Sequence, residues 1–301
     1  NVVAVVATSC AIDQAHVKQC SRRIISGSIT GSGKDGPGFK RPAFDQVAQA
    51  MGGGMSITGA NEDQQVRAGI PIGDLGGGMF AVMGIQAALL EREKSGEGQD
   101  VDISMLDCQI SLLNYMATMH FISGKDPYPI GNSHFVHVPY NTFTTSDGQI
   151  VIAVITDNFW QNLKQVVQIE SLEKPEYDTQ PGRFKDQHFI NAALNDKLST
   201  KSAGHWLGLL EAARIPCAPV NKFSQALSDP QVLHRNMVVE LSDPEGHKTK
   251  GPGNPIKFSR SNEESFSAAP GLGEHTEKVL HDLLGMSSED VSILRAAEVV
   301  S

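Results

Sequence analysis

Short apolar runs alternate with amphipathic segments along the chain, and this alternation predicts an α/β fold. An apolar run between polar or turn-forming residues indicates a strand, whereas apolar positions three and four residues apart indicate a helix. Strand-sized runs occur at 2–7, 24–30, 100–103, 149–155 and 215–220. Helical spacing marks 44–51, 157–168, 186–199, 202–214, 274–284 and 288–297.

Two longer segments are apolar on nearly every side of a helix. Residues 79–90 predict a helix that is buried in the core, because a surface helix would carry a polar face. The charged residues 91–94 follow it, so the helix is expected to end in water. Residues 105–122 predict a second long apolar helix.

The domain organisation is predicted from a change of character after the second apolar helix. Residues 123–148 hold many Gly and Pro residues and show no periodicity, which is typical of a linker and loop. A hairpin is expected around Asp243-Pro244-Glu245-Gly246. We therefore expect a large region at 1–125, a linker and active-site loop at 126–139, a small domain at 140–221, and a linker with a return to the large region at 222–301.

Composition and charge exclude several classes of protein. The 301 residues (32.3 kDa) are 40% apolar and 20% charged, which is the composition of a folded soluble chain. No apolar run approaches the ~18 residues of a membrane helix, so no membrane partner is expected. The 25 basic and 34 acidic residues give a net charge of −9 without a basic stripe, which argues against nucleic acid as a partner.

The four cysteines, Cys10, Cys20, Cys108 and Cys217, have no metal-binding spacing and are too few for a disulfide framework. A reducing compartment is therefore expected. We expect a cytoplasmic protein, or a mitochondrial-matrix protein if the source is eukaryotic. The chain begins with Asn1, and a basic segment before the first apolar run is lacking. We expect that the natural start is missing or altered.

Two motifs match the sequence of known binding motifs but lack the structural context that such motifs require. Gly31-x-Gly33-x-x-Gly36 follows a strand, but the Pro-rich segment after it cannot begin the helix that a dinucleotide-binding loop requires. His134-x-x-His137 lies in an irregular segment without a carboxylate at helical spacing. Neither motif predicts a cofactor or a metal site.

Asp74 stands between an extended segment and the apolar helix, and it allows two interpretations. It could be an ordinary N-cap, which accepts hydrogen bonds from nearby backbone amides. Alternatively, the positive end of the helix could hold an ionised, reactive carboxylate. Gly76, Gly77 and Gly78 favour the second interpretation, because each glycine costs a helix about 1 kcal/mol relative to alanine. Their bare backbone would let a bulky ligand approach, with amides available for an oxyanion.

The chain resembles the class III coenzyme A transferases (CaiB/BaiF-like), the family of formyl-CoA and carnitine CoA-transferases. The resemblance runs from about Arg23 to the C-terminus, and members that handle dicarboxylates look nearest. Its main stretches are ISGSITGSGKDGP, RPAFDQVAQAMGGGMSITG, IPIGDLGGGMFAVMGIQAALLEREKSGEGQDVDISMLD, GNSHFVHVPYNTFTTSDGQIVIAV, IPCAPV, DPQVLHRNMV and LGEHTEKVL.

The resemblance implies a mechanism and a set of site residues. Asp74 falls on the catalytic aspartate, which would form an aspartyl anhydride with the acyl group and then an aspartyl-CoA thioester. Arg41 and Met105 fall where relatives contact CoA, although each could instead be an ordinary surface cation or core side chain. The active-site loop would be Gly131–Tyr140, with Gly131, Asn132, His134 and Tyr140 as its residues of interest. Acyl-CoA and a carboxylic acid would be substrates, and no permanently bound cofactor or metal is implied.

The resemblance also implies a Rossmann-like large domain, a smaller α/β domain and an interlocked homodimer. Residues 1–20 do not resemble the family's opening block, so the large domain is expected to be incomplete at its N-terminus. The loop lacks the consecutive glycines of formyl-CoA transferases, which argues against formate and oxalate as substrates. Two alternatives stay open: an acyl-CoA racemase or isomerase, and a catalytically incomplete chain. Phe44 argues against the racemase, because the racemases place a histidine there as acid and base.

Overall fold

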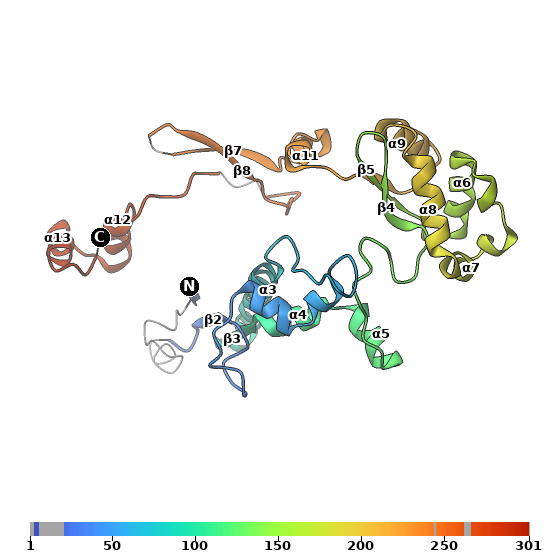
Figure 1. Ribbon diagram of the computed structural model, residues 1–301. Helices are drawn as coiled ribbons and strands as arrows, with labels where there is room; N and C mark the ends of the chain where they lie inside the picture. Colours follow the sequence, from blue (N-terminus) through green and yellow to red (C-terminus); the bar gives the residue numbers. More distant parts are fainter. Residues whose placement is uncertain (1–2, 6–20, 244, 262–265, 301) are drawn as a thin grey trace. The chain divides into compact units, whose positions relative to one another are not determined.

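The computed structural model describes residues 3–5, 21–243, 245–261 and 266–300, and helices and strands alternate along them as the sequence predicts (Figure 1). The chain divides into two compact units, Asn1–Pro219 and Val220–Ser301. The mixed α/β class is confirmed. Cys10 and Cys20 lie outside the described residues.

A small parallel sheet begins the first unit. Its strands are β1 (Val3–Val5), β2 (Ile25–Thr30) and β3 (Asp100–Ser104), in that order across the sheet. Val3 pairs with Ile25, and Ser26 pairs with Asp100. Parallel neighbours need a long crossover, and the segment between β2 and β3 contains the helices α2 and α3. The predicted strands at 24–30 and 100–103 are confirmed.

Four helices accompany this sheet. They are α2 (Asp45–Met51), α3 (Ile72–Ser95), α4 (Met105–Leu112) and α5 (Tyr115–Ser123), and a short 3-10 turn, η2, covers Gly54–Ile57. The single helix predicted over 105–122 is wrong. Asn114 has a backbone φ of 52°, which a continuous right-handed helix does not accommodate, so the chain changes direction there.

The prediction that α3 is buried on all sides is also wrong. It packs against β2, β3, α2 and α4 through small residues such as Ala81 and Ala88. Its other side leaves Met79, Val82 and Leu90 exposed, although all three are apolar. By length and mean hydropathy alone α3 could span a membrane, but its contacts with the sheet and two helices are those of a helix in a folded domain.

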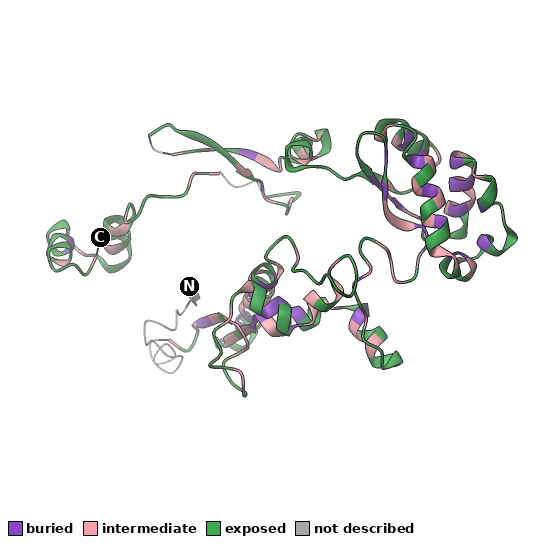
Figure 2. Cartoon of the chain, in the orientation of Figure 1, coloured by how far each residue is buried: buried purple, intermediate pink, exposed green. Residues whose placement is uncertain are grey.

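A second core in the first unit surrounds an antiparallel sheet. Its strands β4 (Tyr140–Thr144), β5 (Gln149–Ala153) and β6 (Cys217–Pro219) pair in that order, and β4 lies in a segment that we expected to be irregular. Buried positions gather in α6, α8 and α9 (Figure 2). The remaining elements are α6 (Asp157–Val167), η3 (Glu170–Leu172), η4 (Pro175–Asp178), α7 (Gln180–Lys185), α8 (Gln187–Leu198) and α9 (Ala203–Ala212).

The second unit contains short elements with little buried surface. The predicted hairpin is confirmed as β7 (Val238–Ser242) and β8 (Lys248–Pro252). The predicted C-terminal helices are confirmed as α12 (Thr276–Leu284) and α13 (Ser288–Ala296). Two further short helices are α10 (Phe223–Ala226) and α11 (Pro230–His234). The expected four-part division of the chain, with a return of 222–301 to the large region, stays a prediction.

Candidate functional site

The first turn of α3 is held by a side chain from another helix. Pro71 is the N-cap residue, and it offers no side-chain acceptor. The Asp45 carboxylate at the start of α2 takes this role, because its Oδ1 accepts from the backbone N of Gly73 at 2.7 Å and of Asp74 at 3.4 Å. Asp45, at the start of α2, therefore caps the N-terminus of α3.

Gln49 completes this arrangement from the next turn of α2. Its Nε2 donates to Asp45 Oδ2 at 2.7 Å, and its Oε1 accepts from the backbone N of Ala68 at 2.9 Å. Gln49 is buried, and both ends of its side-chain amide have partners. The Asp45–Gln49 pair thus connects α2 both to the start of α3 and to the segment that precedes it.

Asp74 itself lies in the first turn of α3, and its side chain is exposed. In the described part of the chain no hydrogen bond or ion pair reaches its carboxylate. The N-cap interpretation is therefore wrong, since Pro71 occupies that position and Asp45 does the capping.

The first-turn amides of α3 already have acceptors. Ile72 N donates to Ile70 O at 2.8 Å, Leu75 N donates to Pro71 O at 3.0 Å, and the two amides between them donate to Asp45. The amides of Gly76, Gly77 and Gly78 follow inside the helix, where each donates to the carbonyl four residues back. The expectation that these glycine amides are available for an oxyanion is therefore wrong. A negative charge that develops beside Asp74 must be stabilised by other groups.

The three glycines differ in their surroundings. A Cβ on Gly76 would lie 3.1 Å from Leu112 Cδ1, and a Cβ on Gly77 would lie 3.2 Å from Ile29 Cγ2. These two glycines let α3 pack closely on α4 and β2, which the sequence interpretation missed. A Cβ on Gly78 would meet nothing within 4 Å, so only Gly78 leaves open space of the kind that a ligand could use.

Arg41 and Met105 have different environments. Arg41 is exposed, and its guanidinium has no partner among the residues that the structure describes. Met105 is buried at the start of α4, where its Cγ lies 3.5 Å from the place of a Gly77 Cβ. This favours the interpretation of Met105 as a core side chain. Arg41 remains available for an anionic ligand.

The expected active-site loop is attached to the fold at both ends. The backbone N of Gly131, whose φ of 63° suits glycine, donates to Gly59 O at 3.0 Å. At the other end the buried Arg183 donates from Nε to Val138 O and from Nη2 to Asp157 Oδ1, each at 2.8 Å. Asn132 between these ends is exposed.

His134 is the centre of an aromatic group that joins three segments. Its ring stacks on Tyr140 with the centroids 5.0 Å apart, lies 4.8 Å from the His137 ring, and stacks more loosely on Tyr115 of α5 at 6.3 Å. Its Nδ1 accepts from the backbone N of Val136 at 3.0 Å and of His137 at 3.2 Å. The proton of the neutral ring is therefore on Nε2.

Burial lowers the pKa of His134, and the neighbouring His137 lowers it further. The neutral form, which can accept at Nδ1, is thereby favoured. Within the described residues no hydrogen bond joins this loop, or Arg41, to the Asp74 side chain. The structure brings His134 and Tyr140 together, and it places Asp74 with Asp45 and Gln49.

Asp45, Gln49 and Tyr115 were missed by sequence reasoning. A polar Gln49 between the apolar positions of a short helix was a usable signal for a buried hydrogen-bonding side chain. Its partners could not be read from the sequence, because Gly73 lies 28 residues beyond Asp45. Cys108 is buried as expected for a core thiol, and burial raises its pKa.

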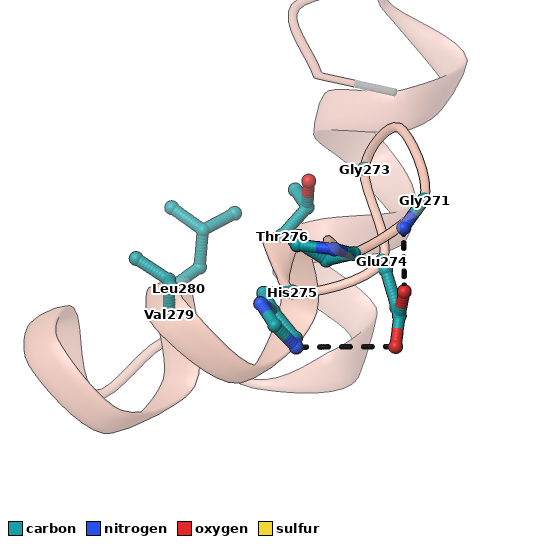
Figure 3. A pocket seen from close by; sticks show the side chains of 8 residues that line it. Gly271, Gly273, Glu274, His275, Thr276, Val279 and Leu280 are labelled. Carbon is teal, nitrogen blue, oxygen red and sulfur yellow. Dashed lines mark hydrogen bonds and ion pairs between the residues drawn. The ribbon is translucent and has the colours of Figure 1, made fainter. Parts of the chain in front are cut away.

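Two features of the second unit resemble binding sites. A cavity of about 420 Å³ lies at the start of α12, lined by Gly271, Glu274 and His275 among others (Figure 3). Glu274 Oε2 accepts from the backbone N of Gly271 at 2.6 Å, so an acidic side chain already occupies the position that an anion would take. None of the predicted site residues lines this cavity.

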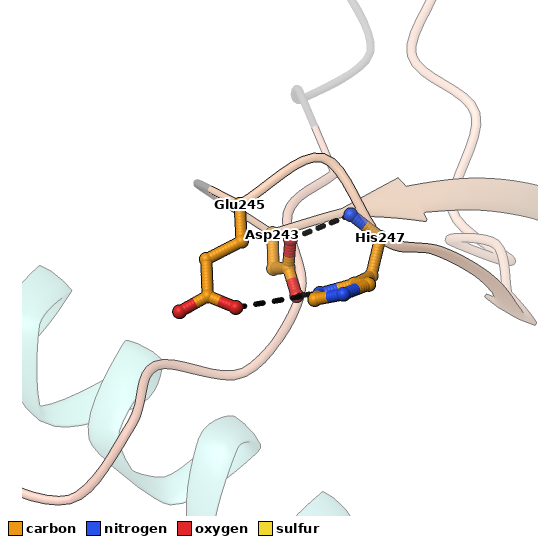
Figure 4. Close-up of side chains that lie close together, drawn as sticks. All are labelled: Asp243, Glu245 and His247. Carbon is orange, nitrogen blue, oxygen red and sulfur yellow. Dashed lines mark hydrogen bonds and ion pairs between the residues drawn. The ribbon is translucent and has the colours of Figure 1, made fainter.

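Asp243, Glu245 and His247 form a cluster at the β7–β8 turn that could hold a metal ion (Figure 4). The two Asp243 oxygens accept from the backbone N and the Nδ1 of His247, each at 2.8 Å. The side-chain bond to His247 and three backbone hydrogen bonds lower the pKa of Asp243, and burial opposes them. These bonds explain the cluster as a turn, without a metal ion.

Known proteins resemble most of the chain. The model of CoA-transferase family III matches residues 1–276, which includes the first 20 residues and ends before the C-terminal segment. The resemblance read from the sequence therefore began too late, at Arg23. A solved CAIB/BAIF family protein from Brucella suis is 30% identical, with a TM-score of 0.80, and the match covers 90% of this chain and 71% of that one.

Three curated relatives carry dicarboxylates in their names. Succinyl-CoA:glutarate CoA-transferase of Homo sapiens is 30% identical over 94% of this chain. Succinate–glutarate CoA-transferase of Agrobacterium fabrum is 31% identical over 90%, and succinyl-CoA:mesaconate CoA-transferase of Haloarcula hispanica is 32% identical over 80%. The matches cover 65%, 68% and 61% of these relatives, so this chain spans about two thirds of their length.

Proposed function

The chain belongs to CoA-transferase family III, and from this premise we propose that it moves CoA from an acyl-CoA to a carboxylic acid, with Asp74 as the temporary acyl carrier. The observation that carries the proposal is the Asp74 carboxylate in the first turn of α3, which is exposed and unpaired among the described residues. A carboxylate without internal partners is free to act as a nucleophile.

The bonds that form and break in the proposed reaction belong to the two substrates and Asp74. An Asp74 oxygen attacks the thioester carbonyl, the C–S bond breaks, and CoA leaves as a thiolate from the mixed anhydride. The thiolate then attacks the aspartyl carbonyl and releases the donor acid, which leaves an aspartyl-CoA thioester. The acceptor carboxylate repeats the exchange in reverse. It departs as its CoA thioester and leaves the carboxylate of Asp74 free, with no net proton taken up or released.

The Asp45–Gln49 pair is proposed to position Asp74. The two amides that Asp45 accepts from belong to Asp74 and the residue before it, so this carboxylate fixes the backbone at the reacting residue. Gln49 holds Asp45 in turn. Misplacing a reacting group by about 1 Å can lower a rate by about 100-fold, so this support is expected to affect turnover.

A dicarboxylate is proposed as the acceptor and succinyl-CoA as the donor. The names of the human, Agrobacterium and Haloarcula relatives support this choice. A formyl-CoA:oxalate CoA-transferase of Streptomyces coelicolor is also 31% identical, so oxalate belongs in the test although the loop lacks consecutive glycines. Arg41 is proposed to attract an anionic part of the substrate, because its guanidinium is exposed and unpaired in the described structure.

The racemase alternative is not supported by the site. Phe44 is 83% exposed, immediately before Asp45, and its ring cannot carry a proton. In the segments that begin α2 and α3, His residues are absent from the described positions 44–51 and 71–78.

The experiment is a transfer assay with the purified chain. Succinyl-CoA is incubated with glutarate, mesaconate, oxalate or acetate, and each new acyl-CoA is identified by mass. We expect transfer to at least one dicarboxylate, and loss of transfer in Asp74→Asn with unchanged circular dichroism. Transfer by Asp74→Asn at the rate of the unaltered chain would contradict the proposal. A folded chain that transfers CoA to no acid would favour the incomplete-chain alternative.

A further inference from the structure

A cavity of about 280 Å³ lies between the 3-10 turn η2 and the helices α4 and α5. Its walls are almost entirely apolar, and Asp74, Asp45 and Gln49 are not among the residues that line it. The principal wall residues are Ile57, Ile110, Leu113, Met116, Phe121 and Pro127.

Ile110 and Phe121 contribute to this wall although they are 50% and 81% exposed. A ligand that covers these apolar side chains removes them from water, which is favourable by roughly 25 cal/mol per Å² of apolar surface buried. An apolar cavity of about 150 Å³ binds benzene, which has six non-hydrogen atoms. In proportion to its volume, this cavity accepts a ligand of about 11 non-hydrogen atoms.

One imidazole supplies a directed polar contact in this apolar wall. His120 Nδ1 lies 3.1 Å from Lys125 O and 3.1 Å from Asp126 Oδ1. Both neighbours are acceptors, so the neutral ring carries its proton on Nδ1 and leaves the lone pair of Nε2 unused. Ser56, another polar lining residue, already donates its hydroxyl to Gly53 O at 2.8 Å.

We propose that this cavity binds a small, mainly apolar alcohol or phenol, whose hydroxyl donates a hydrogen bond to His120 Nε2. Asp126 and Lys125 O are positioning groups, because they set the tautomer that leaves Nε2 as an acceptor. A carboxylate is a poorer ligand, since it offers no proton to Nε2 and would approach the Asp126 carboxylate. The site is separate from the proposed acyl carrier and does not depend on its activity.

The probes are 2-naphthol, which has the predicted size, and naphthalene, which lacks the hydroxyl. Binding to the full chain is measured by titration calorimetry and by ligand-observed NMR. We expect 2-naphthol to bind about tenfold more tightly than naphthalene, because a hydrogen bond to a group held in place contributes about 1 kcal/mol or more. Naphthalene-2-carboxylate is expected to bind more weakly than 2-naphthol.

Two variants test the two parts of the site. His120→Phe keeps an aromatic ring beside Phe121, where the two centroids are now 5.9 Å apart, but removes the acceptor. It should bring the affinity for 2-naphthol down to that for naphthalene. Leu113→Trp should fill the cavity and abolish the binding of both probes. Ile122→Trp, at an 83% exposed position that does not line the cavity, should leave both affinities unchanged.

Several outcomes would overturn the proposal. If neither probe binds, or if Leu113→Trp binds as well as the unaltered chain while circular dichroism shows that it is folded, this cavity is not the site. If His120→Phe leaves the preference for 2-naphthol unchanged, His120 does not recognise the hydroxyl. Asp74→Asn should bind 2-naphthol normally, so failure of CoA transfer and failure of this site give different results.

Discussion

Two aspartates have different roles at the start of α3. Asp74 leaves its carboxylate free, whereas Asp45 uses both of its oxygens on the backbone of α3 and on Gln49. The difference follows from position, since Asp45 faces the open amides of another helix. The proposed reaction depends on both, one as the carrier and the other as its support.

Asp45→Ala tests that support. The variant leaves the amides of Gly73 and Asp74 without their acceptor, so we expect the free energy of unfolding to fall by about 1 kcal/mol, as for a lost helix cap. Turnover should fall by about 10- to 100-fold through misplacement of Asp74. Urea denaturation and the transfer assay measure the two effects.

Asp45→Asn and Gln46→Ala are the matched controls. Asparagine keeps an oxygen that can accept from Gly73 but turns its NH2 group, a donor, towards the donor Gln49 Nε2. It should therefore restore only part of the stability and turnover lost in alanine. Gln46 is exposed on the same helix, and its loss should change neither quantity. Equal turnover in Asp45→Ala and the unaltered chain would show that Asp45 does not position the carrier.

The loop around His134 is predicted to loosen in acid. The pKa of the His134 ring lies below the ordinary 6.5 of histidine, mainly because of burial and also because of His137. As the pH falls, His134 in the unfolded chain therefore takes up its proton before His134 in the folded chain does. Its contribution to stability is thus present above about pH 6.5 and is lost as the pH falls through the folded pKa. Protonated Nδ1 can no longer accept from the amides of Val136 and His137.

NMR measures this directly, through the titration of the His134 ring and the hydrogen exchange of those two amides. After correction for the intrinsic rates, which fall with pH, the protection of these amides should decrease below pH 6.5. His134→Asn offers an acceptor that does not titrate, and its loop amides should exchange independently of pH between 5 and 7 after correction for intrinsic rates. A His134 pKa above 6.5 would contradict the account. The groups that face the ring are His137, Tyr115 and Tyr140.

Asp74 was recognisable as a candidate site residue from the sequence, because an acidic residue stands close before three glycines. The hydrogen bonds that fix the backbone at Asp74 were not predictable. Its surroundings are set by contacts between residues far apart in the chain, such as Asp45 with Gly73. The N-cap interpretation failed for the same reason, since a cap supplied by another helix leaves no local pattern. The stacking of His134 on Tyr115 was equally invisible.

At the scale of elements, α3 shows how one pattern can have two causes. Gly76 and Gly77 allow close packing, whereas Gly78 faces open space. Gly78→Ala should therefore raise the free energy of unfolding by up to about 1 kcal/mol, because alanine is the better helix former and meets no obstacle. Urea denaturation measures the change.

Gly76→Ala is the comparison. Its methyl would lie 3.1 Å from Leu112 Cδ1, so crowding should cancel the gain in helix propensity. Equal stabilisation by both alanines would refute the packing role of Gly76. If Gly78→Ala is more stable and yet transfers CoA more slowly, a ligand approaches the helix at Gly78.

Strands and amphipathic helices were largely predictable, because their burial follows their own periodicity. Two predictions about helices were wrong. The helix over 105–122 breaks at Asn114, where a φ of 52° is imposed without a Gly or Pro to indicate it. The apolar α3 was expected to be buried all round, but composition cannot distinguish a core helix from one with an exposed apolar face.

At the scale of the whole molecule, the apolar residues exposed on α3 suggest association. Met79, Val82 and Leu90 are all more than half exposed. Apolar surface of this kind often marks an interface. We expect the chain to form the homodimer that its family resemblance implies, with about twice the 32.3 kDa mass in analytical ultracentrifugation.

Val82→Glu should weaken this dimer by at least tenfold in dissociation constant, because an interface would bury the new charge. Gln149→Glu adds the same charge at an exposed polar position in β5, outside this helix, and it should leave the mass unchanged. A monomeric unaltered chain at micromolar concentration would contradict the prediction of a dimer.

The central claim is that Asp74 carries the acyl group and then CoA. The most direct measurement is peptide mass spectrometry of the chain after incubation with succinyl-CoA and trapping with hydroxylamine, which converts an activated aspartyl group to a hydroxamate. We predict a hydroxamate on Asp74, and its absence when succinyl-CoA is omitted or Asp74 is replaced by Asn. A chain that transfers CoA while Asp74 stays unmodified, or that is modified at another carboxylate, would contradict the account.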